Sequence, residues 1–246
     1  MPRPPLAQLA ALYRDPATVA DPHEPTPTRA VGKPDGARRM AAWLSRLDPG
    51  PRVLDVGAGD GHQAQALLAI GFAVDALEPS PAARARYRRR NGVEPFDGFL
   101  DEAFVATRAA TYDAVLLSQV LEHLADPERA IALVRRLLRP GGIAVIAVPQ
   151  FRSWLSILSG RRDMFISPPV HLSFFTRSGL AELMRRHGLE QVHADSVTWF
   201  DPDRVAARVR PPALGPALVP ALRVIFGIAD AAGGGNTLEA YFRKLG

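Results

Sequence analysis

The chain contains no cysteine. This absence excludes a disulfide framework, a thiolate-held zinc or iron–sulfur centre and a cysteine nucleophile. Lysine is almost as scarce, since Lys33 and Lys244 are the only two among 30 basic residues and the rest are arginine. Together with abundant alanine and 23 prolines, this preference is typical of a GC-rich coding bias. Such a bias raises the net charge to +5 without a nucleic-acid partner, and we expect none.

Uninterrupted apolar runs are also missing. The first residues hold no apolar run of signal-peptide length, so we expect a cytoplasmic protein. The most apolar segment, residues 205–233, is broken by Pro216, Pro220 and Arg223. A central arginine costs about 2.5–3.5 kcal/mol on insertion into a membrane, so this segment predicts a packed or interfacial helical insert and no transmembrane span. A peripheral contact with a membrane surface stays open.

The length of 246 residues, with 47% hydrophobic and 22% charged residues, is typical of one globular domain. Repeated prolines in residues 1–35 predict an N-terminal arm, because each proline removes a backbone donor and disfavours helix before it. Residues 36–246 are then expected to form the domain itself, as a monomer or a homodimer.

Strand-like and helical segments alternate along this domain. The expected strands are 52–56, 73–77, 94–98, 112–117, 143–148, 189–197 and 238–244, and the main expected helices are 62–70, 82–90, 127–138 and 176–187. Thr176 has the position and side chain of a helix N-cap. This alternation predicts an α/β fold of βαβ units, with a parallel sheet covered by helices on both faces.

A glycine loop follows the first strand and carries the strongest functional signal. A dinucleotide-binding loop would place its third glycine where His62 stands. Here the three glycines occupy every second position from 57 to 61, and the carboxylate of Asp55 stands two residues before the first of them. That carboxylate would repel a pyrophosphate and attract an ammonium group, so the loop favours S-adenosylmethionine over NAD. The expected cofactor contacts in this loop are Asp55, Gly57, Ala58, Gly59 and Gly61.

The end of the second strand gives an independent indication of a nucleoside site. Glu78 stands there, followed by Pro79, and an acidic side chain at this position can accept hydrogen bonds from both ribose hydroxyls. We therefore include both residues in the cofactor site.

With these residues the chain resembles the class I S-adenosylmethionine-dependent methyltransferases, and among them the ubiquinone-biosynthesis O-methyltransferases. Besides the glycine loop, the resemblance rests on Tyr112-Asp113, the run from Val120 to Pro127 (VLEHLADP) and the run from Leu138 to Gly142 (LRPGG). It covers about residues 36–190. It implies a doubly wound, mostly parallel seven-stranded sheet of order 3-2-1-4-5-7-6, with the last strand antiparallel, and S-adenosylmethionine as the cofactor.

The resemblance also implies further site residues. Family members carry an acidic residue near the adenine, and this chain has Phe99 at that place and Asp101 two positions later. Either Asp101 takes over the adenine contact, and it is included among the expected cofactor residues, or Phe99 stacks on the adenine or walls it off. Ser118 and Gln119 follow the fourth strand, where contacts with the methionine part of the cofactor are expected.

Two histidines are candidates for a general base. His123 lies in the VLEHLADP run, and His171 lies in the segment PPVHLSFFT, which resembles one that precedes the sixth strand in the family. A nearby base adds about 10²- to 10⁴-fold to methyl transfer onto a hydroxyl. The alternative is that both histidines only order their turns. No metal site is expected, because no histidine or carboxylate pair at i, i+4 has a third ligand nearby in the sequence.

The acceptor site is expected in residues 151–176, a long apolar connection typical of a lid or substrate wall. Its candidate acceptor contacts are Trp154, Phe165, Phe174 and Phe175, with an ordinary core under a long loop as the alternative. The leading hypothesis is methyl transfer to oxygen of a small apolar or aromatic acceptor. Transfer to nitrogen or carbon, and a catalytically silent cofactor-binding module, are the alternatives.

Overall fold

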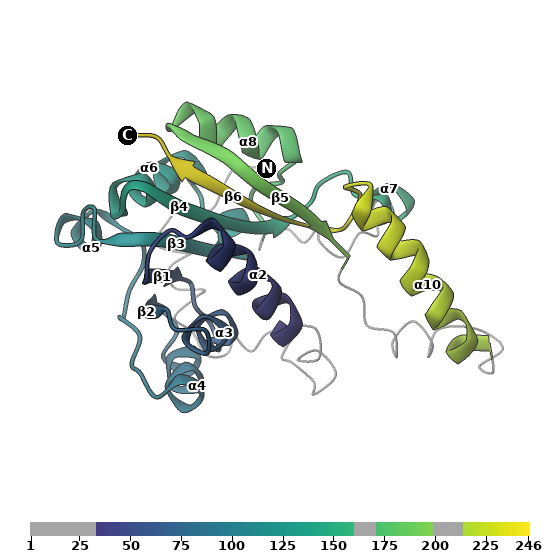
Figure 1. The fold of residues 1–246 in the computed structure, drawn as a ribbon, viewed down its shortest axis with the longest axis horizontal. Helices are drawn as coiled ribbons and strands as arrows, with labels where there is room; N and C mark the ends of the chain where they lie inside the picture. The colour runs from purple at the N-terminus through teal and green to yellow at the C-terminus, as the bar shows by residue number, and fades with distance from the viewer. Residues whose placement is uncertain (1–32, 160–170, 199–213) are drawn as a thin grey trace.

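The structure, a computed structural model, describes residues 33–159, 171–198 and 214–246. Its centre is a six-stranded sheet of order β2-β1-β3-β4-β6-β5 (Figure 1). The strands are β1 (Arg52–Val56), β2 (Ala73–Leu77), β3 (Tyr112–Ser118), β4 (Leu138–Pro149), β5 (Leu189–Val197) and β6 (Thr237–Lys244). Strands β1 to β4 pair in parallel, and β6 runs antiparallel to both of its neighbours, as the resemblance implied.

The predicted seven strands are wrong, and so is the order that counts them. Residues 94–98 were expected as a strand beside β2, but within them Phe96 alone makes an isolated bridge, to Leu77. Pro95 has no N–H to donate, and Gly98 has a φ of 144° that breaks the extended conformation. The segment therefore touches the sheet edge at one point without extending it.

Helices cover both faces of the sheet. They are α2 (Lys33–Leu47), α3 (His62–Leu68), α4 (Pro81–Asn91), α5 (Glu102–Ala106), α6 (Pro127–Leu137), α7 (Trp154–Ser159), α8 (Arg177–Arg186) and α10 (Leu214–Ala231), with the short 3-10 helix η2 (Leu121–His123). Buried residues of α2, α3 and α4 pack against one face, and those of α5, α6 and α8 against the other (Figure 1).

Apolar residues follow one another in β4 without alternating with polar ones, because both faces of the sheet are covered there. Successive side chains point to opposite faces, and here both faces are covered. Ile146 belongs to the cluster shared with α6 and α8, while its neighbour Val145 belongs to the cluster shared with α2 and α3. Both side chains are fully buried.

Local capping fixes where the helices begin. The side chain of Ser80 accepts from Ala83 N at the start of α4, and that of Asp126 accepts from Arg129 N at the start of α6. Proline follows each cap at the first helical position, where its missing N–H costs nothing. Thr176 caps α8, as the sequence predicted.

The apolar insert contains α10, which extends away from the sheet (Figure 1). No helix among the described residues is long and apolar enough to cross a membrane. Residues 205–213 of the insert and 1–32 of the arm lie outside the described residues.

The central strand supplies a direct test of this packing. Replacing Ile146, which is fully buried, by alanine should lower the free energy of unfolding by about 2–5 kcal/mol, because it leaves a cavity between β4 and the helices. The same exchange at Ile225 on α10, whose exposure is 57%, should change it by less than about 0.5 kcal/mol. Urea denaturation measures both, and equal losses would contradict the assigned core.

Candidate cofactor and active site

The glycine loop lies where β1 ends and α3 begins. Gly57, Gly59 and Gly61 have φ angles of 67°, 52° and 77°, a region that residues other than glycine rarely adopt. The N–H groups of Gly57 and Ala58 donate to the carbonyl of Leu77, at 2.7 and 3.3 Å. These bonds hold the loop against the end of β2.

The glycines have different neighbours. A Cβ added at Gly57 would lie 2.5 Å from Cγ2 of Val120, so this glycine allows the loop after β3 to pack closely. A Cβ added at Gly59 would meet no atom within 4 Å. Gly59 therefore presents its backbone to open space, where a ligand can approach.

Glu78 connects the loop to β2. Its Oε2 accepts a hydrogen bond from Gly59 N and its Oε1 accepts one from Ser80 N, both at 2.8 Å. The carboxylate is only 7% exposed, and burial raises its pKa, opposed by these two hydrogen bonds and by the charge of Arg84. Each oxygen keeps a second lone pair, so the carboxylate can still accept from ribose hydroxyls.

Asp55 is the other buried carboxylate at this edge. It is 1% exposed, and its Oδ2 has no hydrogen-bond partner among the described residues. Burial, together with the nearby charge of Glu78, raises its pKa to about 7. A buried acceptor without a donor is costly, and a ligand ammonium group would remove that cost. The buried pair, with the open face of Gly59, therefore fits S-adenosylmethionine.

The end of β3 lies beside the same loop. Ser118 Oγ accepts from Gln63 Nε2 of α3 at 3.0 Å. Gln119 has a φ of 57°, and its N–H donates to Ala147 O at 2.7 Å. A left-handed conformation in a residue other than glycine or asparagine is strained, and such strain clusters at functional sites. Both residues are thus placed near the glycine loop.

The remaining predicted cofactor residues have structural partners. The carbonyl of Pro79 accepts from the guanidinium of Arg84 at 3.1 Å. The side chain of Asp101 caps α5 by accepting from Phe104 N at 2.8 Å. The contacts of Pro79 and Asp101 with a cofactor stay predictions.

The two candidate bases lie together. The rings of His123 and His171 have centroids 4.8 Å apart, although the two residues are distant in sequence. Backbone hydrogen bonds of 2.8 and 3.1 Å, from Leu172 N and Ser173 N to the carbonyl of Glu122, fix the segment that carries His171.

Sequence reasoning missed Glu122. Its side chain is 1% exposed, and Nε2 of His123 lies 3.7 Å from its Oε1. Burial raises its pKa to about 8. The sequence indicated Glu122 only by its position directly before His123. No spacing in the sequence indicates that His171 lies close to these two residues.

The predicted acceptor residues differ in how far they are exposed. Trp154 and Phe174 are exposed by 59% and 42%, whereas Phe175 is buried in the core shared with α6 and α8. The ring of Phe174 lies 5.9 Å from that of Phe151. Phe165 lies outside the described residues.

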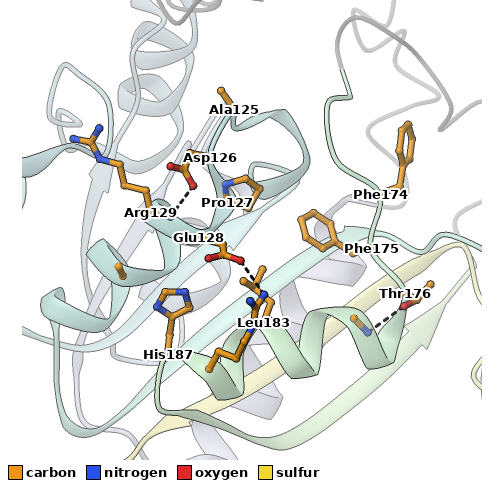
Figure 2. Close-up of a pocket in the computed structure, with 13 residues that line it drawn as sticks. Ala125, Asp126, Pro127, Glu128, Arg129, Phe174, Phe175, Thr176, Leu183 and His187 are labelled. Atoms are coloured by element: carbon orange, nitrogen blue, oxygen red, sulfur yellow. Dashed lines mark hydrogen bonds and ion pairs between the residues drawn. The ribbon is translucent and has the colours of Figure 1, made fainter. Parts of the chain in front are cut away.

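A surface pocket of about 840 Å³ opens between α6, α8 and residues 174–176 (Figure 2). Phe174 and Phe175 line it, together with Arg129 and His187. Glu128 and Arg186, which also line it, form an ion pair of 2.8 Å. None of its lining residues belongs to the glycine loop, so this pocket is distinct from the cofactor site.

Comparison with known proteins agrees with this geometry. The profile of the methyltransferase domain family matches residues 34–194. The chain therefore belongs to that family and is a class I S-adenosylmethionine-dependent methyltransferase, as its motifs predicted.

Among curated relatives, the chain is 26% identical to the ubiquinone biosynthesis O-methyltransferase of Thiobacillus denitrificans over 206 residues, 78% of this chain and 84% of the relative. It is 34% identical to the Caulobacter sp. protein of that name over 102 residues, which is 40% of either chain.

Solved structures share the fold. The 1,6-didemethyltoxoflavin-N1-methyltransferase of Burkholderia thailandensis, solved with S-adenosylhomocysteine, has a TM-score of 0.62 at 23% identity and covers 100% of this chain and 93% of its own. A methyltransferase from Thermotoga maritima has a TM-score of 0.60 at 19% identity, covering 85% and 91%.

The raised pKa of Asp55 predicts a dependence of stability on pH. Because folding raises this pKa from 3.8 to about 7, its protonated form favours the folded state, and that stability is present below the unfolded pKa and lost as the pH rises through about 7. Asp55→Asn should remove the part of this pH-dependent decrease in the free energy of unfolding that comes from Asp55. Urea denaturation of the ligand-free protein between about pH 4 and 8 measures the decrease in the wild type and in the variant. Identical losses in the wild type and the variant would contradict the burial of an unpaired carboxylate.

Proposed function

We propose that this chain transfers a methyl group from S-adenosylmethionine to an oxygen atom of a small, apolar or aromatic acceptor. The observation that carries the proposal is the pair of imidazoles, His123 and His171, whose ring centroids lie 4.8 Å apart. His123 belongs to the turn after β3, which packs through Val120 against Gly57 of the cofactor loop, and His171 comes from the segment before α8. Two bases beside the methyl donor suit an acceptor that must lose a proton. The names of the relatives, ubiquinone biosynthesis O-methyltransferases, support oxygen.

The cofactor supplies a methyl group made electrophilic by the sulfonium. The ionised carboxylate of Asp55 binds the ammonium group, and Glu78 accepts from the ribose hydroxyls. The other expected contacts surround these two anchors: Gly57, Ala58, Gly59, Gly61, Pro79, Asp101, Ser118 and Gln119. Binding by these residues would hold the methyl donor in one orientation, and holding two reactants in contact supplies much of the rate of a transfer between them.

Either His171 or His123 would take up the proton of the acceptor hydroxyl as its oxygen forms a bond to the methyl carbon, and the electron pair of the broken carbon–sulfur bond would stay on sulfur. In this proposal the exposed rings of Trp154 and Phe174 form part of an acceptor wall, and Phe175 supports that wall from the core. The predicted acceptor contact Phe165 lies outside the described residues. An apolar wall excludes water and favours an aromatic or lipid-like acceptor.

The apolar insert supports a peripheral contact with a membrane surface as the route for a lipid-like acceptor. Val224, Ile225 and Ile228 of α10 are exposed by 63%, 57% and 66%. We expect the protein to act in the cytoplasm, as a monomer or homodimer and without nucleic acid.

The cofactor assignment predicts that removing the charge of Asp55 weakens cofactor binding without lowering the stability of the ligand-free protein. Asp55→Asn should weaken S-adenosylhomocysteine binding by about 10- to 100-fold, the value of a hydrogen bond to a charged group, without lowering the unfolding temperature of the ligand-free protein. Wild-type affinity should rise with pH through about 7, because Asp55 must ionise to bind the ammonium group. Isothermal titration calorimetry measures both effects.

The matched control is Asp75→Asn on β2, where the carboxylate is 40% exposed and accepts a hydrogen bond from the hydroxyl of Tyr112. This variant should bind S-adenosylhomocysteine as the wild type does. Unchanged affinity in Asp55→Asn, or an equal loss in the control, would refute the assignment.

The acceptor is found by screening phenols, aliphatic alcohols and amines with a labelled methyl donor. An O-methylated product is expected. Once an acceptor is known, His171→Ala should lower kcat by about 10²-fold or more while changing KM little, as for removal of a proton acceptor. A product methylated only on nitrogen or carbon, or no product at all, would overturn the proposal.

A further inference from the structure

Helix α4 carries five arginines between positions 84 and 90 and lies beside α3 at the β2 edge of the sheet (Figure 1). Such a run on a helix is typical of a solvated face or of a surface that binds anions. Three of these arginines are paired with carboxylates: Arg84–Asp97 at 2.7 Å, Arg86–Asp60 at 2.6 Å and Arg88–Glu94 at 3.2 Å. Because these pairs offset the positive charge of the helix, a surface for anions does not account for the run.

Two of the arginines hold Asp60, which stands between the last two glycines of the glycine loop. Nε of Arg86 donates to Oδ1 of Asp60 at 2.6 Å, and Nε of Arg90 donates to the backbone carbonyl of Asp60 at 2.8 Å. The next residue of the helix continues the contact, since Nδ2 of Asn91 donates to the carbonyl of Gly61 at 3.1 Å. Helix α4 therefore binds both the side chain and the backbone of the loop.

The packing between α4 and the loop is close. Tyr87 is fully buried, and a Cβ added at Gly61 would lie 2.6 Å from its Cδ2 and would overlap Nδ2 of Asn91. Gly61 also has a φ of 77°, which favours glycine. The absence of a side chain at this position thus lets the helix approach the loop closely enough for its arginines to bind Asp60.

Arg84 acts on the other part of the cofactor site, the turn after β2. Its Nη1 donates to the carbonyls of Glu78 and Pro79 at 3.0 and 3.1 Å, and its side chain is only 14% exposed. Burial raises the pKa of Glu78, and the charges of Arg84 and Arg86 oppose that rise. Both arginines therefore favour the ionised carboxylate, which accepts from Gly59 N. One helix thus contacts the two pieces of chain that meet at the cofactor.

We propose that Arg86, through Asp60, and Arg90 are positioning residues that hold the glycine loop in its cofactor-binding conformation. A glycine-rich loop has many alternative conformations, and a protein that adopts the binding conformation for only a fraction of the time loses affinity by that fraction. Neither arginine has to touch the cofactor. The inference goes beyond the proposed acceptor chemistry, and it rests on the placement of S-adenosylmethionine at this loop.

The experiment is binding of S-adenosylhomocysteine by the full chain, without turnover. Arg86→Ala should raise the Kd by about three- to tenfold in calorimetry. In surface plasmon resonance the change should lie in the association rate constant, because fewer molecules hold the binding conformation, whereas the dissociation rate constant stays as in the wild type. Loss of a direct contact with the ligand would instead raise the dissociation rate constant.

The matched control is Arg88→Ala on the same helix. Arg88 also forms an ion pair, but with Glu94, which lies outside the glycine loop, so this variant should bind S-adenosylhomocysteine as the wild type does. Asp60→Ala should reproduce the loss of Arg86→Ala. The double variant should lose no more affinity than either single variant, because both substitutions remove the same pair.

Hydrogen exchange of the ligand-free protein separates loop order from overall folding. The N–H groups of Gly57, Gly59 and Gly61 are all hydrogen-bonded, so their exchange reports whether the loop keeps its conformation. Arg86→Ala should exchange faster over residues 57–61 than the wild type, whereas Arg88→Ala should not. The unfolding temperature of Arg86→Ala should stay within about 4 °C of the wild type, since a partly exposed ion pair adds little to global stability.

Unchanged affinity in Arg86→Ala, an equal loss in Arg88→Ala, or a change confined to the dissociation rate constant would overturn the positioning role. The variant Asp55→Asn separates this failure from that of the cofactor assignment. If Asp55→Asn loses affinity and Arg86→Ala does not, only the role of Arg86 is wrong. If Arg86→Ala slows association and Asp55→Asn binds normally, only the role of Asp55 is wrong.

Discussion

The structure depends on the burial of two carboxylates at the carboxyl ends of adjacent parallel strands. Glu78 accepts from the backbone of the glycine loop and of the turn after β2, so one side chain ties together the parts that would hold a nucleoside. Asp55 lies beside it without a donor for Oδ2 among the described residues. In the ligand-free fold the buried carboxylate of Asp55 lowers stability when it is ionised, and a cationic ligand would remove this cost. The side chain that favours ligand binding therefore destabilises the ligand-free protein.

The sequence predicted the cofactor half of the molecule well. Strands 52–56 and 73–77 have the predicted ends, because each is a short apolar run bounded by proline or glycine. Segment 94–98 was wrong, because Pro95 and Gly98 limit it to a single bridge at Phe96. The edge strands β2 and β5 also have the predicted ends, so the failure at 94–98 comes from these two residues and not from its position at the sheet edge.

The strands and the helix cap of the second half were predicted as well, but the surroundings of Glu122, Phe174 and Phe175 were not. Glu122 lies close to His171 only through the fold, so no motif spacing in the sequence contains the cluster of Glu122, His123 and His171. Phe174 and Phe175 are adjacent and chemically alike, yet one ring is exposed and the other is part of the core. Phe175 forms a bridge with Gln150 beside β4, and successive side chains of an extended segment point to opposite sides. The proposed cofactor residues therefore lie in contiguous motifs, whereas the proposed acceptor residues come from distant parts of the chain.

This division has a consequence for how such enzymes diversify. Helix α10 lies between the last two strands in the sequence and projects from the body, while the carboxylates that we propose as anchors of the methyl donor belong to β1 and to the turn after β2. Substitutions and insertions in that projection leave the donor pocket untouched. New selectivity can accordingly arise at one end of the molecule by drift, without any loss of the inherited chemistry at the other.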